Sequence, residues 1–238
     1  MKSRNGIPAG QHERVSEAIG TSRSMPHCAV RILTMSLSPW KRVSDCLLAA
    51  ALLAVTAPLW VIIILSLLLT QGLPFWYRQR RVGLHGQVFT LVKFRTMTAG
   101  SPPRLPDRPV AKTPADPRIT PLGRLLRRLA LDELPQLINV LSGEMSLVGP
   151  RPLPEADLQE AGWLTLVDEG ERARRLAWLA TRQQVRPGLT GLWQISRNPE
   201  ADFDNWIVCD ETYVATHSWH LDLWILLLTP WAVLRGRQ

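Results

Sequence analysis

Two neighbouring carboxylates, Asp132 and Glu133, lie in the stretch RRLALDELPQL (127–137), which is otherwise apolar apart from its two leading arginines. Pro135 follows them and is tolerated only in the first turn of a helix. The pattern therefore predicts that the pair lies at a helix N-terminus, among free backbone N–H groups that favour negative charge. The plainest interpretation is an N-cap residue followed by a first-turn acid.

The surroundings of the pair favour chemistry over capping. Arg124, Arg127 and Arg128 precede it, and Arg151 follows within the stretch SLVGPRP. Carboxylates hold Mg²⁺ and arginines neutralise phosphate oxygens, so the combination is typical of a site for a metal-bound phosphate. An aspartate can also attack phosphorus as a nucleophile. The sequence contains no Walker-type loop, no HExxH and no GxSxG, and its five histidines show no ligand spacing.

Composition agrees with an acidic partner. The 238 residues carry a formal net charge of +8, and arginine supplies most of it. Arginine suits phosphate recognition, although codon usage would produce the same bias. The three cysteines, Cys28, Cys46 and Cys209, show no metal or disulfide spacing and indicate a reducing compartment. A nucleic-acid binder would explain the basic charge but not the apolar segment described next.

Residues 46–77 contain no charged side chain and are long enough to cross a bilayer as a helix. Their internal position argues against a signal peptide. Basic residues flank the segment on both sides and generally prefer the cytoplasmic face, so both Lys41 and Arg81 are expected to favour that side of the membrane. Pro58 near the middle favours a kink. Two interpretations remain open from these residues: a re-entrant broken helix, and a plain transmembrane helix with a proline kink.

The remaining chain reads as a mainly helical α+β protein. Residues 1–37 form a predicted disordered extension, 38–76 the membrane helix, and 77–238 a cytoplasmic catalytic domain. Within that domain, 77–97 predicts a small β-hairpin around the turn GLHG, and 102–121 a proline-rich loop. Helices are expected over 121–142 and 153–184, and a turn-rich loop over 185–199. The C-terminal apolar run is too short to span, and its tryptophans favour interfacial, amphipathic helices.

The chain resembles the monotopic phosphoglycosyl transferases, bacterial sugar transferases that start glycoconjugate synthesis on a polyprenyl phosphate. The resemblance covers roughly residues 40–235. It rests on KRVSD (41–45), RVGLHGQVFTLVKFRTM (81–97), DPRITPLGRLLRRLALDELPQLINVLSGEMSLVGPRP (116–152), VRPGLTGLWQ (185–194) and SWHLDLWILLLT (218–229).

The resemblance implies a reaction. Members transfer a sugar 1-phosphate from a UDP-sugar to undecaprenyl phosphate and release UMP, at the cytoplasmic face of the bacterial inner membrane. The family nucleophile falls on Asp132, and Glu133 joins it in holding Mg²⁺. Membrane phospholipid is a further expected partner, a homodimer is an option, and nucleic acid is not expected. The alternative is an inactive, membrane-attached phosphate-binding scaffold of the same fold. The sequence does not identify the sugar.

The resemblance also implies phosphate or substrate contacts, and a membrane break. The break falls at Ala57–Pro58, where the family commonly has Ser-Pro, and the chain lacks the glycine that usually precedes Arg197. The implied contact residues are Lys93, Arg95, Arg127, Pro150, Arg151 and Arg197.

Overall fold

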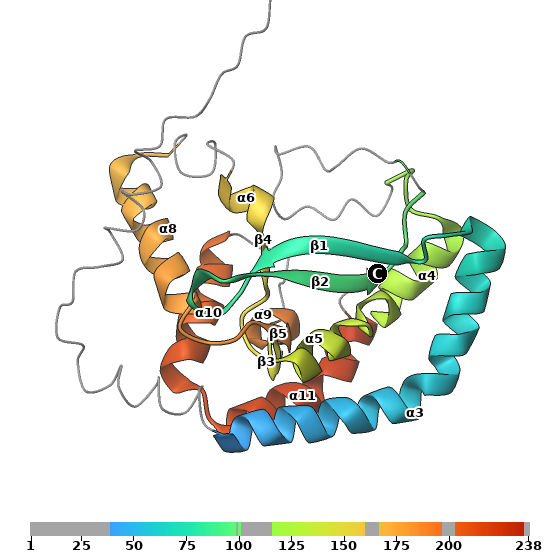
Figure 1. The fold of residues 1–238 in the computed structure, drawn as a ribbon. Helices are drawn as coiled ribbons and strands as arrows, with labels where there is room; N and C mark the ends of the chain where they lie inside the picture. Colours follow the sequence, from blue (N-terminus) through green and yellow to red (C-terminus); the bar gives the residue numbers. More distant parts are fainter. Residues whose placement is uncertain (1–38, 99, 101–115, 160–166, 197–202, 236–238) are drawn as a thin grey trace, which may run out of the picture.

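The computed structural model describes residues 39–98, 100, 116–159, 167–196 and 203–235. Three expectations lie outside these residues: the disordered extension, most of the proline-rich loop, and the position of Arg197. Within the described residues the protein is mainly helical, with one long apolar helix and two small sheets (Figure 1).

Helix α3, Pro39–Gln71, is the long apolar element. At 1.5 Å per residue its 33 residues measure about 50 Å along the axis. Among the described residues it is the one helix long and apolar enough to cross a membrane. The helix is continuous through Ala57 and Pro58, whereas the family resemblance implied a break there. Figure 1 shows that α3 bends instead, which agrees with a proline that removes a single helix hydrogen bond.

The first residues of α3 attach it to the rest of the protein. Lys41 Nζ lies 2.5 Å from Asp222 Oδ2 of α11, Trp219–Arg235. Arg42 donates to the carbonyls of the last residues of α5, Gln136–Ser142. The buried Asp45 accepts from Ser146 Oγ at 2.7 Å. The polar residues of KRVSD therefore dock the helix.

The predicted hairpin is confirmed. Strands β1, Trp76–Val82, and β2, Val88–Phe94, pair in antiparallel register, with Tyr77 opposite Lys93. The turn η1, Leu84–Gly86, contains His85 in the left-handed region at φ 51°. A third strand, β4, Leu153–Pro154, pairs with the end of β1 and brings the segment after residue 150 to the hairpin.

The carboxylate pair does not cap a helix. Helix α4, Pro121–Arg128, is capped by Thr120, whose side chain accepts from the Gly123 N–H. Ala130 then adopts a left-handed conformation at φ 56°, and a 3₁₀ turn follows, η2, Leu131–Glu133. Pro135 is the N-cap residue of α5, so the pair lies one turn earlier than predicted. The reason is the left-handed Ala130, which starts a separate turn before the helix begins.

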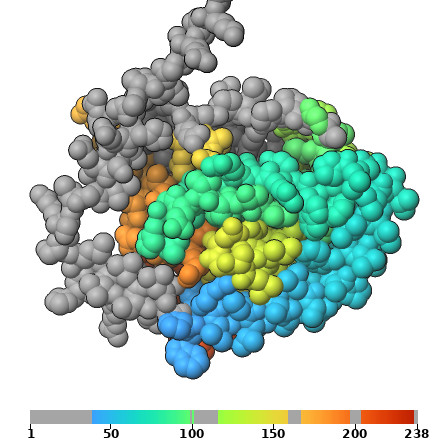
Figure 2. All heavy atoms as spheres, in the orientation of Figure 1, coloured from blue at the N-terminus to red at the C-terminus, as the bar shows by residue number. Residues whose placement is uncertain are grey.

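The remaining elements pack beneath and beside the hairpin. Strands β3, Ser146–Val148, and β5, Gly188–Thr190, form a parallel pair. The predicted helical region 153–184 contains α6, Glu155–Gln159, and α8, Glu169–Arg182. The predicted turn-rich loop instead holds β5 and α9, Leu192–Ile195. Helix α10, Phe203–Thr216, packs on α8, and Figure 2 shows α5 between the hairpin and the start of α3.

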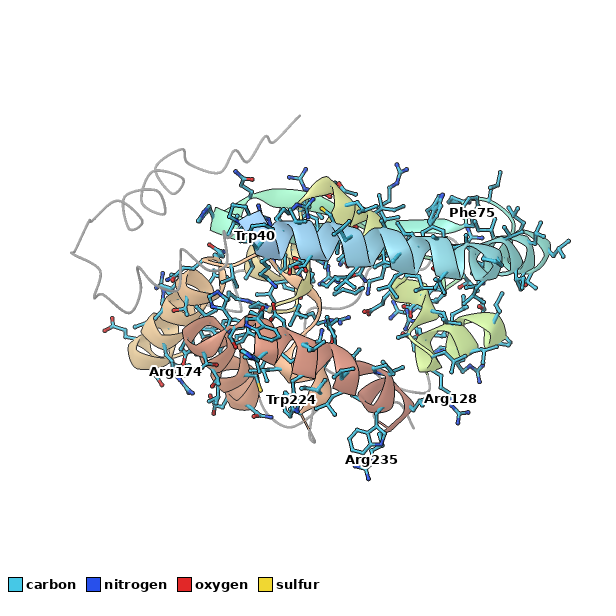
Figure 3. The ribbon with its side chains drawn as sticks, turned by 90° about the horizontal axis from the view of Figure 1, so that it is seen from below. Trp40, Phe75, Arg128, Arg174, Trp224 and Arg235 are labelled. Atoms are coloured by element: carbon cyan, nitrogen blue, oxygen red, sulfur yellow. The ribbon has the colours of Figure 1, made fainter. Side chains whose placement is uncertain are left out.

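One face of the molecule is apolar. Viewed from below, α3 and α11 run along this face, with Trp40 on the first and Trp224 on the second (Figure 3). Large apolar side chains stay exposed along both helices. On α11 these are Trp219, Leu223, Trp224, Leu227, Trp231 and Leu234. Together with the apolar composition of α3, this face is consistent with monotopic membrane association.

Candidate active site

The turn η2 buries both carboxylates. Asp132 is 7% exposed and Glu133 is 8% exposed, although neither is an apolar residue. The short 3₁₀ turn follows α4 directly and packs against β2. Burying an ionised carboxylate is costly unless cations or hydrogen bonds compensate it, so the partners of the pair decide what the turn can do.

Glu133 receives two cations from two other elements. Lys93 Nζ of β2 lies 3.0 Å from Glu133 Oε1. Arg151 Nη2, from the segment between β3 and β4, lies 2.9 Å from the same oxygen. Glu133 therefore connects the hairpin, the 3₁₀ turn and the segment GPRP. The sequence analysis predicted Lys93 and Arg151 as phosphate or substrate contacts and did not predict their contact with Glu133.

A third cation, Arg81, lies beside this group. Arg81 Nη1 donates to the Pro152 carbonyl at 2.7 Å, one residue after Arg151. Burial, together with the nearby Arg151 charge, lowers the pKa of Arg81 to about 10, while Asp157, Tyr77 and Glu133 act in the opposite direction. Sequence reasoning treated Arg81 only as a basic flank of the membrane segment. Arg81 follows Tyr77 by four residues, so the two side chains lie on one face of the strand, and Tyr77 is opposite Lys93. This spacing is the signal that could have placed Arg81 on the same face as Lys93.

Burial and neighbouring charges act in opposite directions on the two cations that contact Glu133. Burial lowers the pKa of Lys93, and Glu133 opposes that shift. The charge of Glu133 raises the pKa of Arg151 against the effect of burial. The Glu133 carboxylate thus favours the charged form of both Lys93 and Arg151, and Arg81 lies beside Arg151 as a further basic group. Basic side chains gathered beside a carboxylate pair suit the recognition of a phosphate group.

Two other predicted site residues have different neighbours. Arg95 donates to the carbonyls of Gln71 and Gly72 at 2.6 and 2.7 Å, and so binds the C-terminal end of α3. Arg127 Nε donates to Thr96 Oγ1 at 2.8 Å on the α4 side of the turn. Neither of these two contacts involves Glu133, whereas Lys93 and Arg151 contact it directly. Ala57 and Pro58 are exposed within α3.

Pro150 lies where two chain segments cross. Its carbonyl accepts from the Gly188 N–H at 2.9 Å, and the Gly149 N–H donates to the Thr190 carbonyl at 2.9 Å. A Cβ atom on Gly149 would lie 2.4 Å from the Arg186 carbonyl oxygen, and one on Gly188 would lie 2.1 Å from Gly149 N. The crossing therefore requires glycine at both positions, and it holds the backbone that presents Arg151.

The carboxylates fit Mg²⁺ only in company with a substrate. Among the described residues, no group of three or more histidine, cysteine, aspartate or glutamate side chains could hold a metal. Mg²⁺ is commonly held by one or two carboxylates together with substrate phosphates and water. Asp132 and Glu133 supply that number of carboxylates, so the donor set fits a metal that arrives with a phosphorylated substrate.

Fold and site together define a protein with an exposed apolar face, consistent with membrane association, and a buried carboxylate pair in contact with basic side chains. Residues 36–236 match the family model for bacterial sugar transferases, and the chain belongs to this family. It is 38% identical over 209 residues to the exopolysaccharide production protein ExoY of Rhizobium meliloti, covering 83% of this chain and 86% of that protein.

Two further relatives carry more specific names. The chain is 40% identical over 194 residues to the UDP-glucose:undecaprenyl-phosphate glucose-1-phosphate transferase of Caulobacter vibrioides, covering 79% of this chain and 67% of that protein. It is 37% identical over 207 residues to the undecaprenyl-phosphate galactose phosphotransferase of Salmonella typhimurium, covering 82% of this chain but only 40% of the longer relative.

Proposed function

We propose that the protein transfers a sugar 1-phosphate from a UDP-sugar to undecaprenyl phosphate and releases UMP, as a first membrane step of polysaccharide or glycoconjugate synthesis. The observation that carries the proposal is the buried Asp132–Glu133 pair beside Lys93, Arg151 and Arg81. The names of the relatives, which act on undecaprenyl phosphate with glucose or galactose, support the same reaction class. The intact pair and its cations favour an enzyme over an inactive scaffold.

The first half-reaction uses Asp132 as the nucleophile. A carboxylate oxygen of Asp132 forms a bond to the sugar-bearing phosphorus of the donor. The bond from that phosphorus to the bridging oxygen breaks, and UMP leaves with the electron pair. Asp132 then holds the phosphosugar as an acyl phosphate. Lys93, Arg81 and Arg151 neutralise the diphosphate, which offsets the repulsion between the anionic nucleophile and the anionic donor.

The second half-reaction returns the enzyme to its starting state. A phosphate oxygen of undecaprenyl phosphate attacks the same phosphorus and displaces the Asp132 carboxylate. The product is a lipid-linked diphosphate sugar. Asp132 and Glu133 would hold Mg²⁺ with the donor, and the ion would supply charge neutralisation at the phosphate oxygens. The protein's own residues position the donor and exclude water from the acyl phosphate.

We further propose that α3 is re-entrant and that the catalytic domain lies on the cytoplasmic face. Both ends of the helix are attached to the same body, through Lys41 and Asp222 at its start and through Arg95 at its end. One folded body lies on one side of a membrane, so these contacts favour a helix that enters and leaves by one face. Basic residues at both flanks support the cytoplasmic side.

The test of the function is a half-reaction without the lipid acceptor. The full chain in detergent or nanodiscs, supplied with UDP-sugars, should release up to one UMP per active site and gain the mass of a hexose phosphate on Asp132. Asp132→Asn should abolish both signals because an amide cannot form the acyl phosphate. Glu133→Gln should lower turnover and its Mg²⁺ dependence while the adduct still forms.

The kinetic pattern separates the mechanisms. Covalent catalysis requires ping-pong kinetics in donor and acceptor. A ternary-complex pattern with no adduct on Asp132 would leave the pair as a metal site and refute the covalent route. Absence of UMP release from every UDP-sugar, with and without undecaprenyl phosphate, would refute the transferase itself.

A further inference from the structure

A second buried ion pair lies behind the active site and takes no part in the proposed chemistry. Arg182, the last residue of α8, lies 3.3 Å from Asp210 of α10. Arg182 is 6% exposed and Asp210 is 2% exposed. Trp178 Nε1 also donates to Asp210 Oδ2 at 3.2 Å. The pair connects two helices that contain no proposed catalytic residue.

Indole rings surround the Arg182 guanidinium. The central carbon of the guanidinium, Cζ, lies 4.5 Å from the ring centroid of Trp178 and 5.5 Å from that of Trp206. Such cation–π contacts replace part of the lost hydration of a buried guanidinium. A buried ion pair is nevertheless weak evidence for stability, since apolar side chains of similar volume join helices equally well. The charge therefore needs another explanation.

The explanation lies in the next contact of Arg182. Its Nη2 donates to the backbone carbonyl of Arg151, whose own side chain reaches Glu133. An apolar residue could not make this bond. The Arg151 guanidinium also lies 5.6 Å from the ring centroid of Trp193, and that ring packs on Trp206 with centroids 5.3 Å apart. One aromatic cluster thus contacts Arg182 directly and Arg151 through Trp193.

The segment that carries Arg151 depends on such outside contacts. Pro150 and Pro152 flank Arg151 and have no backbone N–H to donate, although they restrict the backbone torsion. The Pro152 carbonyl is bound by Arg81, and the Arg151 carbonyl is bound by Arg182. Two arginine side chains therefore hold consecutive carbonyls of this segment.

We propose that Arg182 and Asp210 are positioning residues that orient Arg151 toward Glu133 and the donor diphosphate. Asp210 holds Arg182, and Arg182 holds the Arg151 carbonyl, so helices α8 and α10 align a phosphate-binding side chain on a segment that neither contains. The inference rests on the proposed function, in which Arg151 contacts the donor.

The experiment measures UDP binding by the full chain in detergent with Mg²⁺, using calorimetry, alongside the donor KM and kcat. Arg182→Lys keeps a positive charge for Asp210, but its shorter side chain cannot reproduce the geometry in which Nη2 contacts both Asp210 and the Arg151 carbonyl. We expect about tenfold weaker UDP binding, the loss of roughly one hydrogen bond to a charged group, with a larger change in KM than in kcat. Asp210→Asn should act in the same direction and is nearly isosteric.

A matched control exists on the same two helices. Arg174 of α8 pairs with Asp204 of α10 at 2.6 Å, on the surface, and this pair does not include Arg151. Arg174→Gln should leave UDP binding and KM unchanged. The thermal midpoint of each variant separates a local effect from unfolding.

Double variants decide whether Arg182 acts through Arg151. In an Arg151→Ala background, Arg182→Lys and Asp210→Asn should have no further effect on UDP binding. Equal weakening in both backgrounds, or unchanged binding in the single variants, overturns the positioning role while leaving the proposed function intact. Wild-type affinity for UDP in Arg151→Ala itself refutes the phosphate role of Arg151, and the inference with it.

Discussion

Arg81 is the main addition that the structure makes to the predicted site, because its positive charge lies beside that of Arg151. The pKa of Arg81 is lowered to about 10 by burial and by Arg151, so its charge is costly in the empty site. An anionic donor would relieve that cost. Arg81→Met should therefore weaken donor affinity, measured as KM, by about tenfold to a hundredfold, from roughly 1.5–3 kcal/mol per charge-assisted bond.

The neighbouring strand residue provides the control for Arg81. Arg80 points to solvent, with its side chain 69% exposed, and pairs with Glu155. Arg80→Gln should leave the donor KM within about twofold of wild type, as expected for exposed ion pairs. Equal effects of the two substitutions would assign the loss to general strand charge rather than to the site.

Asp210 should make the stability of the folded protein depend on pH, in a direction that its pKa shift defines. Burial raises the pKa of Asp210 to about 6, from an ordinary value of 3.8, although Arg182 and the Trp178 hydrogen bond act to lower it. The folded state therefore binds this proton more tightly than the unfolded state. The corresponding stability is fully present below pH 4 and is lost as pH rises through about 6, on the order of 3 kcal/mol.

The comparison with Asp210→Asn measures this contribution. The difference in thermal midpoint, wild type minus variant, should decrease as pH rises from 4 to 6.5 and stay constant above. A difference that increases over the same window would mean that Arg182 and Trp178 lower the pKa of Asp210 below 3.8.

At the residue scale, the sequence predicted a set of site residues but not the contacts among them. Asp132, Glu133, Lys93 and Arg151 were identified from residue type, spacing and family resemblance. Arg81 and Arg182 were not, because their roles depend on which strand face turns inward and on how α8 docks behind the segment 149–152. Neither property can be read from the neighbouring residues alone.

At the scale of elements, α3 sets the relation between membrane and site. The helix is bound to the catalytic body at both ends, so we expect both ends on one side of the membrane. In a cysteine-free background, Pro39→Cys and the exposed Arg78→Cys should react with an impermeant reagent from the cytoplasmic side of sealed vesicles. Labelling of these two positions from opposite sides would establish a spanning helix.

Pro58 supplies the matching element-scale variant. Pro58→Ala restores a helix hydrogen bond and removes the cause of the bend. We expect part of the population to expose the cysteine at position 39 on the opposite face of the membrane, with lower activity. An unchanged labelling pattern would mean that the end contacts alone fix the topology.

Sequence patterns predicted the helices and strands better than the connections between them. The apolar segment, the hairpin and the helices of 153–184 follow from periodicity and composition. The left-handed Ala130, which separates α4 from the turn with the carboxylates, has no local signal because alanine ordinarily favours the helix. The sequence analysis predicted a loop where the structure has β5 and α9. Three residues cannot form a strand alone, and β5 is a strand because it pairs with β3, which lies far away in the sequence.

At the scale of the whole molecule, the exposed apolar side chains of α3 and α11 form the surface that we expect to face lipid. Leu227 is 69% exposed on α11. Leu227→Glu places a charge on this surface and should reduce liposome flotation severalfold with little change in thermal midpoint. Leu176→Glu on α8, 44% exposed, is the control and should float like wild type. Equal flotation of both variants would place the membrane surface elsewhere.

The crossing of Gly149 and Gly188 bears on how this enzyme family can evolve. A methyl group at either position would overlap the backbone of the other segment, so any replacement displaces the peptide that presents Arg151. We therefore expect single substitutions of either glycine to be removed by selection. Under the proposed function, a duplicated gene would acquire a new sugar preference through changes away from the crossing, while the backbone that presents Arg151 is inherited unaltered.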